Sequence, residues 1–172
     1  MSTAVKIYKN VLNNQTLTYL MKWVSDNELL FKDNGKGRKR LRLQDTNEIF
    51  NDFTEIEVKL KNLIKHDGLI PNHEFGDHGH IFLYQNEGVS TDKHIDDYHA
   101  GYKTVRINTT ISAPEHGGRL VVSGVPIDAT VGTTLVFYPS EVEHWSEEVI
   151  GKTPRIALSL AYCFPINKQL NA

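Results

Sequence analysis

Two histidines and one aspartate have the residue types and the spacing of a metal-binding site. His94 and Asp96 are two residues apart, so that on a β-strand both side chains would point to the same side. His144 lies far along the chain in another segment of β type, and would supply a third ligand from a facing strand. Two imidazoles and one carboxylate on one face of a metal ion leave positions open for other ligands, an arrangement that suits non-haem Fe(II) and its reactions with oxygen. The spacing therefore indicates an iron site, although one His-x-Asp pair is weak evidence among eight histidines.

The other histidines are rival ligands. Asp97 and His99 form a mirrored pair that overlaps the first, and we expect them in a loop after the metal pair, near the pocket mouth. The remaining five are expected to be surface or loop residues that bind no metal: His66, His73, His78, His80 and His116.

An arginine after His144 has the setting of an anion-binding residue. Arg155 begins a segment of β type in which Arg155, Ala157 and Ser159 share one face. If that face lines the interior of the protein, the charge of Arg155 is costly unless an anion pairs with it. A guanidinium can bind a carboxylate through two parallel hydrogen bonds. The alternative is an arginine on the solvent face of an edge strand. The pattern alone leaves both interpretations open.

Basic residues are concentrated between Gly35 and Arg42. The five are Lys36, Arg38, Lys39, Arg40 and Arg42. Glycines on both sides of Lys36 favour a mobile flap, in which Arg38 and Arg40 are the candidate substrate contacts. Such a basic loop, residues 36–42, could contact an acidic peptide or the phosphates of a nucleic acid. The alternative is a solvated loop or strand edge.

The elements that must position these residues fall into two parts. A short strand is expected at Val5–Tyr8, and amphipathic helices from about Gln15 to Asp26 and from about Thr46 to His66. In the first helix an apolar stripe is formed by Leu17, Leu20, Met21 and Val24. From His78 onward, short segments of β type alternate with turns: His80–Tyr84, Thr104–Ser112, Leu120–Ser123, Thr133–Tyr138, Val142–Val149 and Arg155–Phe164. This pattern predicts an α+β fold that is mainly β, with two N-terminal helices packed on a sandwich or barrel.

Length and composition limit the class of protein. A chain of 172 residues with 40% hydrophobic residues is typical of one domain, which we expect to span residues 1–172. Residues 1–70 would form the helical support with the basic loop, and residues 78–164 the catalytic core. A net charge of -2 excludes a general attraction to nucleic acid or to an anionic membrane. One cysteine, Cys163, excludes an internal disulfide and favours a reducing compartment. With no long apolar run, we expect a cytoplasmic protein without a membrane partner.

The motifs from Ile81 to Phe164 together resemble those of the 2-oxoglutarate- and iron(II)-dependent dioxygenases, in particular the prolyl 4-hydroxylase-like branch. The resemblance rests on the order of Tyr84 and Gly88 before His94-x-Asp96, then Gly117-Gly118-Arg119-Leu120, then Gly132 to Pro139, and finally His144, Val149, Gly151 and Arg155. Members of the family have a double-stranded β-helix core, also described as jelly-roll or cupin-like. This agrees with the short strands expected above.

The resemblance implies a role for each matching residue. His94, Asp96 and His144 would hold Fe(II), and Arg155 would pair with the distal carboxylate of 2-oxoglutarate. Two hydroxyl residues would support this cosubstrate: Tyr84, and Ser159 four positions after Arg155. Thr110 occupies a position where the family often has a tyrosine facing the cosubstrate. Oxygen is the second cosubstrate, and ascorbate an optional addition.

The reaction implied is hydroxylation of a target coupled to oxidative decarboxylation of 2-oxoglutarate to succinate and CO2, on a prolyl residue of a peptide or protein. Thr91 and Thr110 depart from the family pattern at positions that shape the pocket. Hence the same chemistry on a free amino acid, another small molecule or a nucleic acid stays open. A metal- or ligand-binding β-sandwich without catalysis is the remaining alternative.

Overall fold

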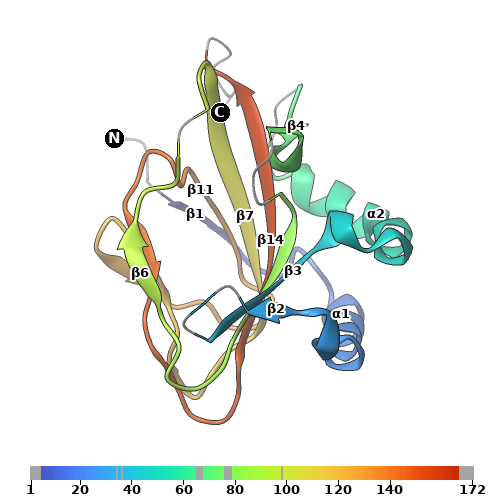
Figure 1. Ribbon diagram of the computed structural model, residues 1–172, viewed down its shortest axis with the longest axis vertical. Coiled ribbons are helices and arrows are strands. Elements are labelled where there is room, and N and C mark those ends of the chain that lie inside the picture. Colours follow the sequence, from blue (N-terminus) through green and yellow to red (C-terminus); the bar gives the residue numbers. More distant parts are fainter. Residues whose placement is uncertain are drawn as a thin grey trace.

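The computed structural model of the chain describes residues 5–33, 35, 37–64, 68–75, 79–97 and 99–166, without the side chains of residues 47–52, 73 and 75. The predictions for Lys36, His66 and His78, and for the side chain of His73, lie outside the described residues. Two β-sheets face each other, and two helices cover the outer face of the larger sheet (Figure 1).

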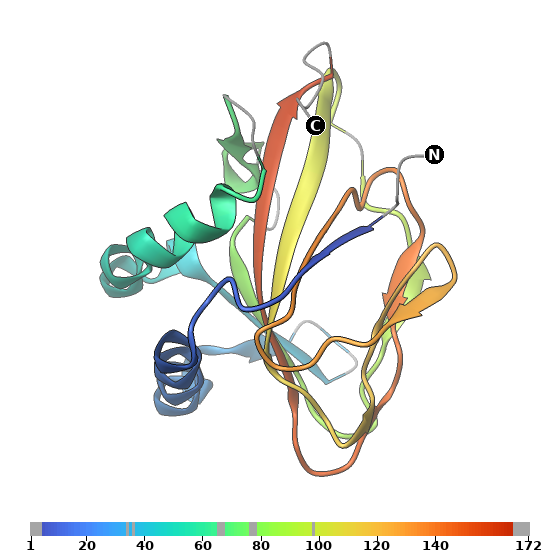
Figure 2. The same cartoon turned by 180° about the vertical axis from the view of Figure 1, so that it is seen from behind.

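The larger sheet is antiparallel. Its strands are, in spatial order, β1 (Val5–Tyr8), β11 (Thr134–Phe137), β7 (Tyr102–Ser112), β14 (Arg155–Pro165), β5 (Ile81–Gln85), β3 (Arg38–Arg42) and β2 (Lys32–Asp33). A further short strand, β4 (Ile70–Pro71), pairs with β14. The two long strands β7 and β14 form its centre, while β1 is an edge strand that lies at the front in the view of Figure 2.

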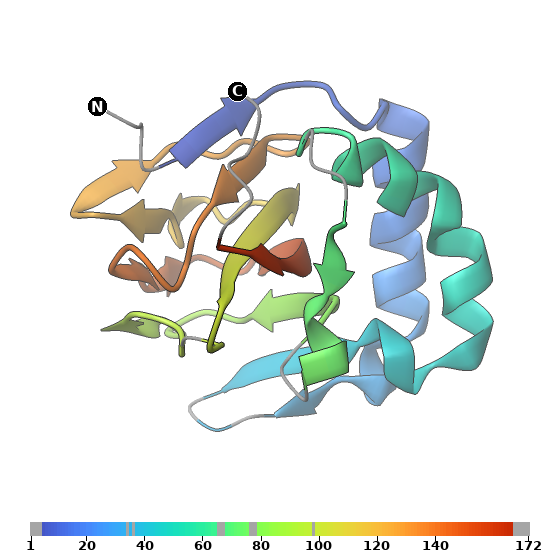
Figure 3. The same ribbon diagram turned by 90° about the horizontal axis from the view of Figure 1, so that it is seen from above.

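The smaller sheet closes the other side of the molecule. It contains β10 (Val125–Ile127), β9 (Leu120–Val122), β12 (His144–Ser146) and β6 (Thr91–His94). A separate pair is formed by β8 (His116–Gly117) and β13 (Val149–Ile150). Seen from above, the smaller sheet and the helices lie on opposite sides of the larger sheet (Figure 3). The predicted double-stranded β-helix core with N-terminal helices is confirmed.

The helices begin and end near the predicted positions. Helix α1 spans Asn14–Asp26, and the side chain of Asn13 caps it by accepting a hydrogen bond of 2.8 Å from the Thr16 backbone N–H. Helix α2 spans Asn47–Lys61 and ends before the predicted His66. Short 3-10 turns lie at Glu28–Leu30 (η1), Leu43–Asp45 (η2) and Asn72–Phe75 (η3). No helix in the described part of the chain is long and apolar enough to cross a membrane.

The main hydrophobic core lies between the helices and the larger sheet. On β14, one face packs into this core through Ile156, Leu158, Leu160, Tyr162 and Phe164. The stripe of α1 contributes Leu17, Leu20 and Val24, whereas Met21 is exposed. Because this burial supplies most of the stabilisation, the opposite face of β14 can carry polar groups toward the smaller sheet.

The basic segment was expected as a mobile flap, with a solvated loop or strand edge as the alternative, and residues 38–42 are a strand rather than a flap. Residues 38–42 form β3, which pairs with β5 on one side and with β2 on the other. Leu41 is buried and lies opposite Phe82 in the pairing. Pairing on both sides satisfies the backbone N–H and C=O groups, so a segment with one apolar residue still forms a strand.

Two further expectations need correction. The predicted strand Val142–Val149 is divided into β12 and β13, which belong to different sheets. The other predicted strands are present, with ends shifted by at most two residues. They are Val5–Tyr8, Arg155–Phe164 and the four that correspond to β5, β7, β9 and β11. His80, expected in a surface loop, is 2% exposed. Its ring packs 4.8 Å from the ring of Tyr162, and its Nδ1 accepts a hydrogen bond from the Ala161 backbone N–H.

Candidate active site

The three predicted metal ligands converge on one point. His144 lies directly opposite His94 in the pairing of β12 with β6, and the ring centroids are 4.3 Å apart. Asp96 follows two residues after His94, past the end of β6 rather than on it. Its Oδ1 lies 3.3 Å from Nε2 of His94 and 3.7 Å from Nε2 of His144. The candidate ligand atoms of the three side chains all lie within 4.8 Å of one another.

Both imidazoles are oriented by backbone carbonyl groups. Nδ1 of His94 lies 2.6 Å from the Asp92 carbonyl oxygen, and Nδ1 of His144 lies 3.1 Å from that of Val142. A ring nitrogen that faces a carbonyl oxygen carries the proton and donates it, which leaves Nε2 with its lone pair. Both Nε2 atoms point toward Asp96, so the donor set fits a metal ion held by two imidazoles and one carboxylate.

Asp96 is held as a carboxylate. Burial by itself raises the pKa of Asp96, but the close contact with the His94 ring and the positive charge of Arg106 outweigh it and keep the pKa well below its usual range. Arg106 on β7 donates from Nε to Oδ2 of Asp96 at 3.2 Å. The Asp96 backbone N–H also donates to the Pro139 carbonyl oxygen. One carboxylate oxygen is therefore engaged by Arg106 while the other faces the two histidines.

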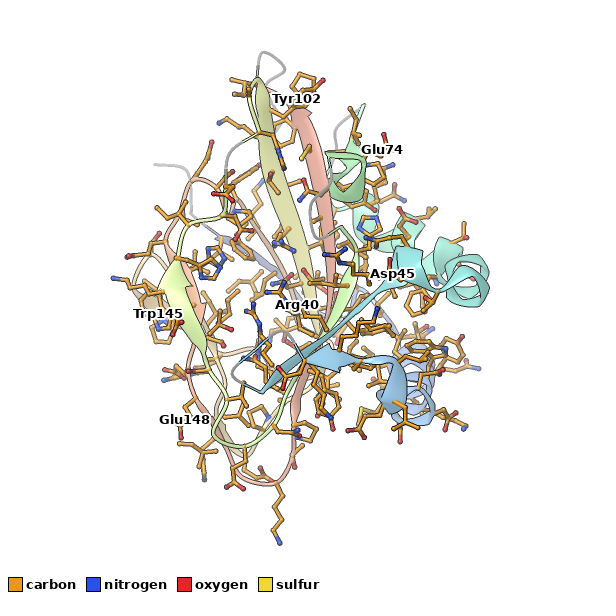
Figure 4. All side chains as sticks on the ribbon, viewed as in Figure 1. Arg40, Asp45, Glu74, Tyr102, Trp145 and Glu148 are labelled. Carbon is orange, nitrogen blue, oxygen red and sulfur yellow. The ribbon has the colours of Figure 1, made fainter. Side chains whose placement is uncertain are left out.

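The triad borders a cavity of about 540 Å³ between the two sheets. Strand β3 forms part of its wall through Arg38 and Arg40, so these two predicted substrate contacts do line the site. Figure 4 places Arg40 near the centre of the view, and Trp145 at the outer side of the smaller sheet. Asp97 and His99 lie in the connection between β6 and β7 as predicted, and neither lines this cavity.

Arg155 lies on the cavity face of β14, which excludes the solvent-face alternative. Its Nη1 donates to Oε1 of Gln85 at 2.6 Å, and burial lowers the pKa of its guanidinium to about 10. Within the described residues, no carboxylate lies within ion-pair distance of Arg155. A half-buried cation without an anionic partner among the described residues is costly, so this position fits an anionic ligand.

Two buried polar side chains share this part of the cavity. Ser159 is on the same face of β14 as Arg155, and its Oγ accepts a hydrogen bond of 3.3 Å from Nη1 of Arg106. Asn108 on β7 is 7% exposed, and its Oδ1 has no hydrogen-bond partner in the described part of the chain. The predicted Ser159 and the unpredicted Asn108 are both placed to contact a bound ligand.

Tyr84 does not reach the cavity. Successive side chains of β5 alternate between the sheet faces, so Leu83 lines the cavity and Tyr84 points to the opposite side. The Tyr84 ring lies 5.8 Å from the Phe31 ring and beneath Nζ of Lys39 at 5.5 Å. The predicted contact between Tyr84 and the cosubstrate therefore does not fit this structure.

Thr110 lies beyond the triad cavity. It borders an adjoining cavity of about 490 Å³, which shares Asn108, Leu120 and Arg155 with the first. Thr110 thus shares a cavity with Arg155 and not with the triad of His94, Asp96 and His144.

Sequence reasoning missed Arg106 and Gln85. Gln85 is fully buried, and its Nε2 lies 3.0 Å from Oγ of Ser146 and 3.3 Å from Oγ1 of Thr91. The sequence does contain a signal for Arg106, because this charged residue lies between the apolar Val105 and Ile107 in a segment predicted as a strand. Gln85 carries no such signal, because its partners come from three other segments.

Comparison with solved structures places the fold among the 2-oxoglutarate-dependent oxygenases. A prolyl hydroxylase from Trichoplax adhaerens, in complex with a peptide fragment of the hypoxia-inducible factor oxygen degradation domain, has a TM-score of 0.76 at 15% identity, covering 98% of this chain and 89% of that one. HygX from Streptomyces hygroscopicus, with nickel, 2-oxoglutarate and hygromycin B bound, has a TM-score of 0.73 at 13% identity, with 98% and 86% covered. A viral collagen prolyl hydroxylase from Paramecium bursaria chlorella virus-1, in its 2-oxoglutarate complex, has a TM-score of 0.61 at 14% identity, with 94% and 96% covered. No protein-family model and no curated protein sequence matches the chain. At these identities the likeness defines the fold, which is the one that the sequence motifs suggested.

Proposed function

We propose that the protein is a 2-oxoglutarate- and Fe(II)-dependent oxygenase that hydroxylates a prolyl residue in a peptide or protein. One observation carries the proposal: the His94, Asp96 and His144 triad shares a cavity with Arg155, a cation that no described carboxylate pairs with. A site for a metal alone would not need the arginine. A site for a simple anion would not need the triad.

Iron would be held by Nε2 of each histidine and by a carboxylate oxygen of Asp96, the donor set that the geometry presents. Bound Fe(II), with 2-oxoglutarate and oxygen, would supply the oxidising chemistry that converts 2-oxoglutarate to succinate and CO2 and hydroxylates the target.

The protein's own groups bind and orient the cosubstrate. Arg155 would bind its distal carboxylate with two N–H donors, while Ser159 and the Asn108 amide contact it from neighbouring positions. Arg106 keeps Asp96 ionised and in place. Apolar side chains exclude water beside the metal ligands, and the Phe137 ring packs edge-on 5.3 Å from the ring of His144.

The prolyl target is supported by the kinds of protein that share the fold. Two of the three similar structures described above are prolyl hydroxylases, one of them with a peptide. HygX, with hygromycin B, keeps a small-molecule target as the alternative.

The reaction class is tested by adding Fe(II) and then 2-oxoglutarate to the protein without oxygen. We expect a visible metal-to-ligand charge-transfer band, followed by succinate release once oxygen is admitted. Asp96→Asn should abolish both signals, and Asp97→Asn is the matched control because Asp97 is exposed and outside the cavity. No band in the intact wild-type protein, or wild-type succinate release by Asp96→Asn, would contradict the class.

The target is tested separately by mass spectrometry of proline-containing peptide pools, free proline and small-molecule pools. Addition of one oxygen atom to a prolyl residue is the expected result. Oxygen found only in free amino acids or other small molecules would contradict the prolyl target and leave the reaction class standing.

A further inference from the structure

The cavity has an excess of positive charge. Its charged lining residues are Arg38, Arg40, Arg106 and Arg155 against Asp92 and Asp96. With neutral histidines, four positive charges against two negative ones leave a net charge of +2 among the described lining residues. Bound Fe(II) and the dianion 2-oxoglutarate cancel each other's charge, so this excess is still present when both are in place. The cofactor and cosubstrate of the proposed function therefore do not account for all of the arginines.

Two of the four arginines already have a role in the proposed function. Arg155 would meet the distal carboxylate of 2-oxoglutarate, and Arg106 engages Asp96 at 3.2 Å. The other two, Arg38 and Arg40, come from one strand on the opposite side of β5 from Arg155. They are the arginines that a second anion would contact.

Strand β3 presents both side chains to the cavity. Arg38 and Arg40 are two residues apart and line the cavity together, while Lys39 between them turns to the other face. Nζ of Lys39 lies 3.0 Å from Oε1 of Glu28 and over the ring of Tyr84. Thus Arg38 and Arg40 face the cavity, while Lys39 lies on the opposite face of the sheet.

Arg38 is fixed near the triad. Its Nη1 donates to Oγ1 of Thr91 at 3.1 Å, on the strand that carries His94. Burial lowers the pKa of Arg38, and the nearby charge of Arg106 lowers it further, against the opposing effect of Asp96 and Asp92. Crowding of like charges at a partly buried site is relieved when an anion enters.

We propose that the substrate carries a carboxylate close to the group that reacts, and that Arg38 and Arg40 bind it, so that the enzyme selects acidic peptide segments. The inference rests on the proposed function, whose target it specifies. The excess charge lies inside a cavity of about 540 Å³ and the whole chain has a net charge of -2, which favours a group that enters the cavity over the long backbone of a nucleic acid.

The test compares two blocked pentapeptides, acetylated and amidated, with a central proline and either two glutamates or two glutamines on each side. Binding is measured by calorimetry to protein loaded with Mn(II) and 2-oxoglutarate. We expect the glutamate peptide to bind at least about tenfold more tightly than the glutamine peptide, which is the gain typical of a hydrogen bond to a charged group. Arg40→Gln and Arg38→Gln should reduce this preference to about twofold or less.

Two variants make the result specific. Lys39→Gln removes the same charge from the same strand on the opposite face, and should retain the preference for the acidic peptide. Arg40→Lys keeps the charge without the planar fork, and should retain part of it. Equal affinity for the two peptides would overturn the inference, as would tighter binding of a single-stranded oligonucleotide or equal loss of preference in Lys39→Gln.

Oxygen addition to the peptides separates this inference from the proposed function. Hydroxylation of both peptides with equal efficiency and equal affinity would leave the function standing and overturn the acidic site. Selective binding of the glutamate peptide without hydroxylation would support the acidic site and contradict the prolyl target.

Discussion

Arg106 links Asp96 of the candidate metal site to Ser159 of the candidate cosubstrate site. Its Nε donates to Asp96 and its Nη1 to Ser159, so one rigid guanidinium orients both side chains. The position lies on β7, at the centre of the larger sheet, where the backbone is held on both sides. Arg106 would thus act on a bound metal through Asp96, as a positioning residue.

Replacing Arg106 by Gln should weaken metal binding by about 10- to 100-fold, as is usual when a partner of a ligand is lost. Asp96 then loses a charged donor that keeps it ionised. Titration with Mn(II), followed by its paramagnetic resonance signal, measures the change. Arg119→Gln is the control, since Arg119 pairs with Glu147 at the surface. Unchanged Mn(II) affinity in Arg106→Gln would show that the contact has no role in holding the metal.

Arg155 and Tyr84 differ in which sheet face they occupy, so they should differ in their effect on the cosubstrate. Arg155→Gln should raise the 2-oxoglutarate concentration for half-maximal charge-transfer absorbance by about 30-fold or more, because losing one partner of a buried charge pair costs about 2–5 kcal/mol. Tyr84→Phe should leave that concentration unchanged. A comparable rise in Tyr84→Phe would restore the role that the sequence suggested for Tyr84.

At the scale of elements, β3 determines whether the basic residues form a rigid wall or a mobile flap. Leu41 anchors the strand in the main core, where it is 5% exposed. Arginines presented by a paired strand hold a fixed spacing, which favours selective binding over loose electrostatic attraction.

Shortening the Leu41 side chain tests whether β3 is part of the stable sheet. Leu41→Ala should lower the free energy of unfolding by about 2–5 kcal/mol, since a buried leucine is replaced by a cavity. Val125→Ala on β10, where the side chain is 59% exposed, should change it by about 0.5 kcal/mol or less. Urea unfolding measures both variants. A value for Leu41→Ala near that of Val125→Ala would mean that β3 is not part of the stable sheet.

At the scale of the whole molecule, a polar contact joins the helical layer to the sheet beneath it. Glu57 on α2 accepts a hydrogen bond of 2.8 Å from the hydroxyl of Tyr162 on β14, and lies 3.4 Å from Nε2 of His80. The close contact with His80 is the main cause that lowers the pKa of Glu57, against the opposing effect of burial.

This contact predicts a pH dependence of stability. A carboxyl group with a lowered pKa in the folded state stabilises the fold above its unfolded pKa, and the contribution is lost as the pH falls toward the folded pKa. Glu57→Gln should therefore cost about 1–2 kcal/mol near pH 7, and the difference from wild type should shrink as the pH falls below about 4. Urea unfolding at a series of pH values measures it. A difference that is constant with pH would contradict the role of the charge.

The sequence by itself determined the features that depend on neighbouring residues. The alternation along Arg155–Phe164 predicted that Arg155 and Ser159 share one face of that strand, because side chains of a strand point alternately to its two faces. The period of the first helix likewise depends on residues a few positions apart. The order of the motifs was enough to indicate the double-stranded β-helix and the triad.

Only the tertiary structure decided which distant side chains meet. The strand at Arg38–Arg42 forms because β5 and β2 pair with it, and its own residues give little sign of this. Tyr84 turns away from the cavity because the register of β5 puts Ile81 and Leu83 on the cavity side. The contacts of Arg106 with Asp96 and Ser159 join three segments that fold together. Such contacts depend on the pairing of whole strands, whereas a local pattern reports only the preference of each segment.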